Sequence, residues 1–288
     1  MTHVTVLPPR TPVDEQGYVV VRRMLQEGEV AVLTGAGMST ASGIPDYRGP
    51  DGQRRVRPMQ YDEFLADADG RRRYWSRAYA GWERFAAARP NAAHEAVAAW
   101  QRLGALRGLV TQNVDGLHQA AGATDVIELH GNLARVVCLD CGRTYPRSQM
   151  HAWLSSANPG FRACSTEVRP DGDVALSDSQ VAAFHLVHCP ECGGDRIKPD
   201  VVFFGGTVER PLVDQAYGVV EAARSLLVLG SSLQVMSGYR FVRRAAALGI
   251  PVAVVTRGGT RGHRETGVHL DALLGDVLPR LTADLATG

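Results

Sequence analysis

The 288-residue sequence contains a single lysine, Lys198; every other member of its 31 Lys and Arg residues is arginine. With 30 Asp and Glu residues the formal net charge is only +1, which excludes a general electrostatic attraction to nucleic acid or to an anionic membrane. The sequence also lacks an apolar run near the roughly 18 residues of a membrane span, and its first residues lack a secretory signal pattern. We therefore expect a soluble, cytoplasmic protein.

The chain has five cysteines, which in a cytoplasmic protein serve as metal ligands or free thiols more often than as disulfides. Four of them form two CxxC pairs, Cys138 with Cys141 and Cys189 with Cys192, and glycine follows each pair. Two such pairs complete the tetrahedral four-sulfur shell of structural zinc, with no open position for water or substrate. We expect one structural Zn²⁺ here; buried or redox thiols are the alternative, and Cys164 stands alone.

Six short apolar segments have the length and composition of buried strands. They are residues 30–34, 108–111, 126–129, 200–204, 226–229 and 251–256. Segments with helical periodicity or many alanines, such as 90–106 and 210–223, lie beside several of them, and this alternation favours parallel pairing. The predicted fold class is therefore α/β, with a Rossmann-like doubly wound parallel sheet.

Glycine and polar residues follow every one of these six segments. In chain order they are GAGMS, QNVDGLH, HG, GG, GSS and RGG. Because ligands of open α/β sheets bind at the carboxyl ends of the strands, six such ends predict a binding cleft.

Two stretches interrupt the alternation of strands and helices. Residues 138–192 hold both cysteine pairs and a segment rich in Pro, Gly and Asp, which predicts a smaller inserted zinc-binding module. Residues 49–93 carry aromatic side chains at partly helical spacing, which predicts a helical module with an aromatic core, together with a cofactor loop. The Rossmann-like domain would then comprise residues 1–48, 94–137 and 193–288. Within the helical module, the arginine run 71–73 favours a solvated face.

The segment GAGMST, residues 35–40, resembles the first half of the dinucleotide fingerprint G-x-G-x-x-G, with Thr40 in place of the third glycine. No acidic residue ends a second strand about 20 residues later, where a dehydrogenase holds the adenine ribose. The segment continues instead into SGIPDYRG. Nucleotide binding is therefore favoured, and standard oxidoreductase chemistry, including that of a zinc-dependent dehydrogenase, is not.

Several motifs together resemble the sirtuin family of NAD-dependent protein deacylases. They are GAGMSTASGIPDYRG, TQNVDGLH, ELHG, the paired cysteines, KPDVVFFG and GSSLQV, and they occur in the family's order over residues 30–278. The long segment between the cysteine pairs, PDGD, RYW and GYRF are most similar to the class II sirtuins. The resemblance implies a Rossmann-type NAD-binding domain, a small zinc domain, and a cleft between them where NAD and an acyl-lysine meet.

The same resemblance implies a role for individual residues. NAD would be bound by Gly35, Ala36, Gly37, Ser39, Pro45, Asp46, Tyr47, Arg48, Gln112, Asn113, Asp115, Gly230, Ser231, Ser232, Thr256, Arg257 and the backbone at Leu274. The catalytic residues would be His130, as general base, and Asn113, which would order the ribose and a water; an ordinary histidine pKa of about 6.5 suits a base at neutral pH. Val201, Phe203 and Val235 would line the acyl-lysine channel.

The family's reaction consumes NAD as a co-substrate. By the resemblance, the acyl-lysine amide oxygen attacks the anomeric carbon of the nicotinamide ribose, nicotinamide leaves, and an alkylimidate forms. His130 then activates a ribose hydroxyl, which leads to free lysine and O-acyl-ADP-ribose. The expected partner is an acyl-lysine protein or peptide, with no direct nucleic-acid or membrane partner.

Two other functions use the same residues. The site could transfer ADP-ribose to a protein side chain, or the chain could be a non-catalytic NAD-sensing module that binds protein or nucleic acid. His130, Asn113 and Asp115 argue against a silent module, because a binder has no need for a base beside the ribose. The acyl chain, the protein targets and the oligomeric state stay open at this point.

Overall fold

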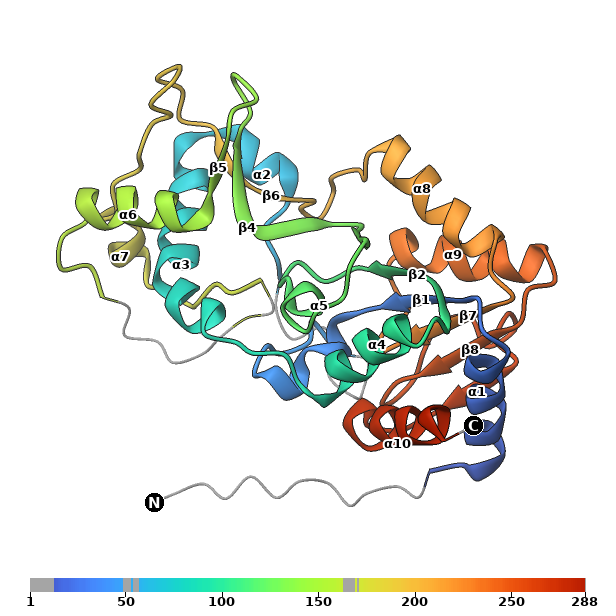
Figure 1. The fold of residues 1–288 in the computed structure, drawn as a ribbon. Coiled ribbons are helices and arrows are strands. Elements are labelled where there is room, and N and C mark those ends of the chain that lie inside the picture. Colours follow the sequence, from blue (N-terminus) through green and yellow to red (C-terminus); the bar gives the residue numbers. More distant parts are fainter. Residues whose placement is uncertain (1–12, 49–52, 54–56, 163–168, 170, 288) are drawn as a thin grey trace, which may run out of the picture.

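The computed structural model describes residues 13–48, 53, 57–162, 169 and 171–287, and these form a large and a small unit (Figure 1). Cys164 lies outside the described residues. None of the described helices has the length and apolar character of a membrane span.

Six parallel strands form the sheet of the large unit, in the order β3-β2-β1-β7-β8-β9. They are β1 (Val30–Thr34), β2 (Leu106–Thr111), β3 (Val126–Glu128), β7 (Ser225–Leu229), β8 (Val252–Val255) and β9 (Val268–Leu270). Five of these strands confirm predicted segments. The edge strand β9 was not predicted, because three residues that include His269 carry too short an apolar pattern.

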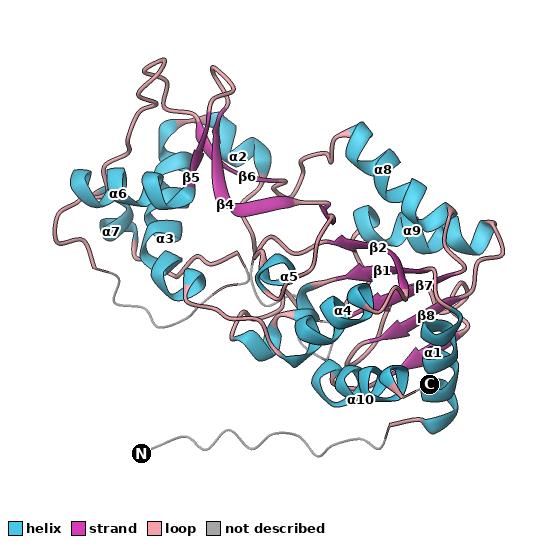
Figure 2. Ribbon diagram, in the orientation of Figure 1, coloured by secondary structure: helices cyan, strands magenta, loops and turns pink. Residues whose placement is uncertain are grey.

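Helices cover both faces of this sheet (Figure 2). One face packs against α1 (Glu15–Glu27), α4 (Ala92–Arg102) and α10 (Leu274–Ala286), and the other against α8 (Arg210–Glu221) and α9 (Met236–Ala247). Successive residues of β1 alternate between the two cores: Val30 and Val32 belong to the first and Ala31 and Leu33 to the second. This confirms the doubly wound α/β fold.

The small unit combines an antiparallel sheet with four helices. Its strands are β4 (Gly131–Cys138), β5 (Thr144–Pro146) and β6 (Ile197–Val201), and its helices are α2 (Tyr61–Ala66), α3 (Ala68–Ala86), α6 (Arg147–Ala157) and α7 (Asp178–Ala182). Phe64, Tyr74 and Trp75 of α2 and α3 are buried against this sheet, and the Trp75 indole N–H donates to the Ile197 carbonyl at 2.8 Å. The aromatic residues of the helical module are therefore core residues, as predicted.

Two sequence predictions were wrong in this unit. The segment 200–204 is not a strand of the parallel sheet: β6 ends at Val201 and pairs antiparallel with β4. A short apolar run does not specify which sheet it joins, and β4 and β6 carry the small sheet beyond the expected limits of 138 and 192. The run 71–73 is not a wholly solvated face either, because Arg71 is buried and pairs with Asp195 at 2.7 Å.

The strand order places a binding crevice between β1 and β7. The chain runs from β1 toward β2 on one side and from β7 toward β8 on the other, so the loops that follow β1 and β7 diverge. They nevertheless touch at glycines: the Gly37 N–H donates to the Gly230 carbonyl at 2.8 Å, and a Cβ on Gly37 would lie 2.9 Å from the Gly230 Cα. Glycine is required where two backbones approach this closely.

Candidate active site

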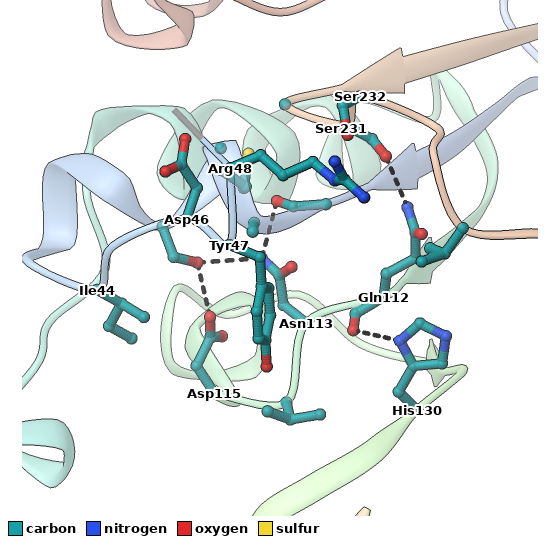
Figure 3. Close-up of a pocket in the computed structure, with 18 of the residues that line it drawn as sticks. Ile44, Asp46, Tyr47, Arg48, Gln112, Asn113, Asp115, His130, Ser231 and Ser232 are labelled. Atoms are coloured by element: carbon teal, nitrogen blue, oxygen red, sulfur yellow. Dashed lines mark hydrogen bonds between the residues drawn. The ribbon is translucent and has the colours of Figure 1, made fainter. Parts of the chain in front are cut away.

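A cavity of about 940 Å³ opens at the carboxyl ends of the parallel strands, between the two units, and Figure 3 shows part of its lining. It brings together every residue that the sequence assigned to NAD, to catalysis or to the acyl channel. They are Gly35, Ala36, Gly37, Ser39, Pro45, Asp46, Tyr47, Arg48, Gln112, Asn113, Asp115, His130, Val201, Phe203, Gly230, Ser231, Ser232, Val235, Thr256, Arg257 and Leu274. The predicted cleft is confirmed, and the misplaced segment 200–204 still reaches it from the small sheet.

A hydrogen-bonded cluster joins the loop after β1 to the loop after β2. Ser39 is buried and its hydroxyl donates to Asp115 Oδ2 at 2.6 Å, while the Asn113 side-chain amide donates to Ser39 Oγ at 3.1 Å and to the Gly35 carbonyl at 3.0 Å. Burial raises the pKa of Asp115, and the hydrogen bonds from Ser39 and from the Leu117 N–H oppose that rise. The cluster fixes amide and carboxylate groups at the cavity wall.

Gln112 joins the loop after β2 to the loop after β7. Its side-chain amide donates to Ser231 Oγ at 3.0 Å (Figure 3). Its backbone N–H donates to the Thr34 carbonyl at 3.0 Å. A Cβ on Gly238 would lie 2.4 Å from Gln112 Oε1, so the first turn of α9 packs directly on this side chain. Gln112 therefore links three elements that line the cavity.

His130 lies directly before β4, where the chain passes from the large sheet to the small one. Its Nδ1 lies 2.8 Å from the Gln112 carbonyl oxygen and its Nε2 lies 2.8 Å from Ser237 Oγ. Burial lowers the pKa of His130, the hydrogen bond to Gln112 opposes that shift, and the nearby Arg240 charge adds to it. The ring is therefore neutral at physiological pH, as a general base must be.

The segment 45–48 forms one wall of the cavity. Figure 3 shows the Tyr47 ring directed into the space beside Asn113 and Asp115. The same ring makes an edge-on contact with Phe204, with 5.5 Å between centroids. This contact joins the loop after β1 to the segment that follows β6, so it spans the two units.

One end of the cavity is mainly apolar. Val201 and Phe203 lie there with Tyr74 and Phe85 of α3, and the Tyr74 and Phe203 ring centroids are 5.0 Å apart. Asp171 also lines the cavity, and burial raises the pKa of its carboxyl group. An acyl chain would find apolar contacts at this end.

Another part of the cavity wall is formed by the loops after β7 and β8. Thr256 is buried and its N–H donates to the Leu270 carbonyl at 3.0 Å. Arg257 lies 3.8 Å from Asp271, which also accepts from the Gly258 N–H at 2.9 Å. These contacts fix a polar pocket beside the N-terminus of α10, where Leu274 begins the helix.

The four paired cysteines converge at the tip of the small unit. Their sulfur atoms all lie within 4.8 Å of one another, with 3.7 Å between Cys138 and Cys192 and 3.8 Å between Cys141 and Cys189. Four sulfurs at the usual zinc–sulfur distance of about 2.3 Å from one ion lie about 3.8 Å apart, so this spacing fits tetrahedral zinc. The thiolates would hold the ion by themselves, and its role would be structural.

Two matching turns present these sulfurs. The Gly142 N–H donates to the Cys138 carbonyl at 2.8 Å, and the Gly193 N–H donates to the Cys189 carbonyl at 2.8 Å. Both glycines have positive φ, 74° and 71°. Glycine adopts this backbone conformation without strain, so it permits the tight turn after each cysteine pair.

Sequence reasoning missed several polar residues of the cavity, among them Ser237, Arg240 and Asp171. Ser237 and Arg240 lie on the first turns of α9, where the spacing of three residues places them on one face. That spacing is common on any helix and marks no motif. Only the packing of α9 against Gln112 brings the two residues to His130.

Comparison with known proteins agrees with this geometry. The sequence pattern of the Sir2 family matches residues 35–237. The NAD-dependent protein deacetylase 1 of Streptomyces coelicolor is 52% identical over 273 residues, which is 94% of this chain and 90% of that protein. The human mitochondrial NAD-dependent protein lipoamidase sirtuin-4 is 44% identical over 278 residues, 95% of this chain and 88% of that protein.

Solved structures show the same likeness in three dimensions. A complex of Sir2 with a p53 peptide and NAD⁺ superposes with a TM-score of 0.74 at 28% identity, and covers 93% of this chain and 98% of that one. Both the large and the small unit are therefore part of the similarity.

Proposed function

Because the chain belongs to the Sir2 family, we propose that it is an NAD-dependent protein lysine deacylase, which releases nicotinamide and forms O-acyl-ADP-ribose. NAD would be a co-substrate, consumed once per acyl group removed. The names of the relatives, which include NAD-dependent deacetylases and a deacylase, support this class of reaction. The acyl-lysine would be carried by a protein or peptide.

One observation carries the proposal: a neutral histidine base shares a cavity with both a polar and an apolar compartment. His130 lines the same cavity as the cluster of Ser39, Asn113 and Asp115 and as the apolar residues Val201 and Phe203. A reaction that joins a polar nucleotide to an apolar acyl chain requires such an arrangement. Proximity of the two substrates then supplies much of the rate acceleration.

The polar compartment would hold NAD. We assign the pyrophosphate to Gly35, Ala36 and Gly37, where the absence of side chains lets backbone N–H groups approach phosphate oxygens. The Asn113 and Asp115 side chains would bind the nicotinamide end, with the ribose ordered by Asn113. Tyr47 would cover the reacting face of the sugar and exclude water from it. The loops after β7 and β8 would hold the adenosine.

The apolar compartment would hold the acyl chain. A substrate peptide would lie extended between the segments 203–206 and 231–235, and would add a strand between them. The isolated bridge between Gln60 and Phe204 places backbone in an extended state at this point. Val201, Phe203 and Val235 would then contact the acyl-lysine side chain.

The test is mass spectrometry of the products formed from purified protein, NAD and a panel of acyl-lysine peptides, beside His130→Ala. Acetyl, butyryl, longer aliphatic, branched, lipoyl and dicarboxylic acyl groups should be included. NAD-dependent loss of the acyl group with O-acyl-ADP-ribose, abolished in His130→Ala, is the expected result. Release of nicotinamide with ADP-ribose attached to protein, and no deacylation of any peptide, would overturn the proposal.

A further inference from the structure

The hydrogen bonds of His130 determine which of its ring nitrogens is the base. A backbone carbonyl can only accept, so the 2.8 Å contact with the Gln112 carbonyl requires a proton on Nδ1. In a neutral imidazole the other nitrogen then carries the lone pair. Nε2 is therefore the atom that would take up a proton during the reaction.

That nitrogen already has a partner. Ser237 Oγ lies 2.8 Å from His130 Nε2, and because Nε2 is an acceptor, the serine hydroxyl must donate. The lone pair of the base is thus occupied by the Ser237 proton. A substrate hydroxyl cannot reach Nε2 directly while this hydrogen bond is present.

The fold holds Ser237 at this place. It is the second residue of α9, and the next residue, Gly238, packs so closely on Gln112 that a side chain there would clash. Arg240, one turn further along the helix, lines the cavity and disfavours a positive charge on His130. Gln112 thus fixes both the Nδ1 proton of His130 and the turn that carries Ser237.

Ser237 also lines the cavity that would receive the substrates. A serine oxygen has two lone pairs in addition to its proton, so it can accept from a substrate hydroxyl while it donates to His130. This is the arrangement of an activated hydroxyl next to a histidine base, here placed where a ribose hydroxyl has to lose its proton.

We propose that Ser237 is a catalytic residue that relays the proton from the substrate ribose hydroxyl to His130. The O–H bond of the ribose breaks as its proton moves to Ser237 Oγ, and the Ser237 O–H bond breaks as that proton moves to Nε2. The ribose oxygen keeps the electron pair with which it attacks, Ser237 is regenerated as a hydroxyl, and His130 becomes an imidazolium. The relay rests on the proposed deacylation.

The experiment compares wild type with Ser237→Ala, Ser237→Thr, His130→Ala and the control Ser155→Ala, which alters an exposed serine of α6. Single-turnover deacylation of the peptide that wild type prefers reports the base-dependent step. Exchange of labelled nicotinamide into NAD reports the earlier step, which does not use the base. Proton inventories in mixtures of H₂O and D₂O report how many protons move in the base-dependent step.

General acid–base groups contribute on the order of 100-fold or more to a rate, so Ser237→Ala should slow deacylation by about that factor. The rate of nicotinamide exchange should stay within about threefold of wild type. The plot of deacylation rate against the fraction of D₂O should be curved in wild type, where two protons move, and linear in Ser237→Ala. Ser237→Thr, which keeps the hydroxyl, should recover most of the rate.

Three outcomes would overturn the relay. They are a Ser237→Ala variant that deacylates within about threefold of wild type, an equal loss of deacylation and nicotinamide exchange in Ser237→Ala, and a linear inventory in wild type. The second would mean that Ser237 supports substrate binding, and the third that it only orients His130. If the wild-type protein deacylates none of the peptides, the proposed function itself is wrong. That result differs from the three outcomes above, so a failure of the function is distinguished from a failure of the relay.

Discussion

The Ser39 hydroxyl donates to Asp115 at 2.6 Å, although the two residues come from loops that follow different strands. Ser39 lies after β1, and Asp115 lies after β2. Asn113 belongs to the same loop as Asp115 and also donates to Ser39. The bond therefore ties together the two loops that would hold the pyrophosphate and the nicotinamide end of NAD.

Ser39→Ala should weaken NAD binding selectively. The change leaves the buried Asp115 carboxylate without its hydroxyl donor, and a hydrogen bond to a charged group contributes about 1.5–3 kcal/mol. We expect the KM for NAD to rise roughly tenfold or more, whereas the KM for the acyl peptide should stay within about twofold of the wild-type value. Steady-state kinetics with each substrate varied in turn measures this, with Ser155→Ala as the control. A rise confined to the peptide KM would contradict the assignment of this cluster to NAD.

The cysteine cluster should bind one zinc ion per chain. The four thiolates complete the coordination shell of the ion. Removal of one therefore weakens the binding of the ion that holds the two cysteine turns together. Cys141→Ser should lower the metal content and the Tm, and prolonged chelation of wild type should do the same. Metal analysis by mass spectrometry and thermal unfolding provide the measurements. Cys164→Ser is the matched control and should keep its zinc; zinc loss in that variant, or a full zinc content in Cys141→Ser, would contradict the predicted ligand set.

Two buried histidines behind the cofactor loops should make the fold sensitive to acid. His94 and His118 are fully buried, their ring centroids are 5.0 Å apart, and His118 Nε2 lies 3.0 Å from Thr34 Oγ1. Burial lowers the pKa of His94 to about 4 and that of His118 to about 3. Each ring ordinarily titrates near 6.5, so between pH 6.5 and 4 the unfolded chain binds more protons than the folded one.

The free energy of unfolding should therefore be insensitive to these two histidines above pH 6.5 and should fall below it. The slope contributed by each histidine approaches about 1.4 kcal/mol per pH unit. Urea unfolding from pH 8 to pH 5 measures how the free energy of unfolding depends on pH. His94→Gln should reduce this slope by the contribution of one histidine. His185→Gln, which alters an exposed residue, should leave it unchanged. A slope that is the same in His94→Gln and in wild type between pH 7 and pH 5 would contradict the prediction.

The features of this structure that could be predicted are those formed by residues close together in the sequence. The strand β1 and the glycines after it are adjacent in the chain, so an apolar run followed by Gly35 and Gly37 predicts a ligand loop without knowledge of the fold. The cysteine pairs are also local signals, and only their convergence required the structure. Apart from Leu274, the cavity residues that the family resemblance implied all belong to motifs at or after the end of a strand.

The missed features depend on tertiary packing. Residues 197–201 join the antiparallel sheet because β4 arrives beside them, and no property of the segment alone distinguishes this from a parallel strand. Lys198, the single lysine of the sequence, is buried, and its amine donates to the Pro199 carbonyl at 2.7 Å and lies 4.7 Å from the Phe203 ring centroid. Ser237 reaches His130 only because α9 begins against Gln112.

Val201→Trp should lower the activity on long acyl chains much more than the activity on short ones. Val201 lines the apolar end of the cavity and packs with the cluster that contains Phe85, so a larger side chain would fill space that a long acyl chain needs. Filling a pocket with a larger group costs binding chiefly for ligands that must overlap with it. We expect kcat/KM for long aliphatic acyl peptides to fall at least about tenfold, whereas the acetyl peptide should stay within about threefold of wild type.

The control is Val19→Trp, which alters an exposed valine of α1, a helix that contributes no residue to the cavity lining, and should change neither value. The ratio of kcat/KM for long and short acyl chains is the quantity to compare, because it cancels any loss of folded protein. An equal loss for every acyl length would mean that Val201 contacts the lysine stem or the peptide rather than the end of the acyl chain. In that case the acyl chain would have to extend elsewhere in the cavity.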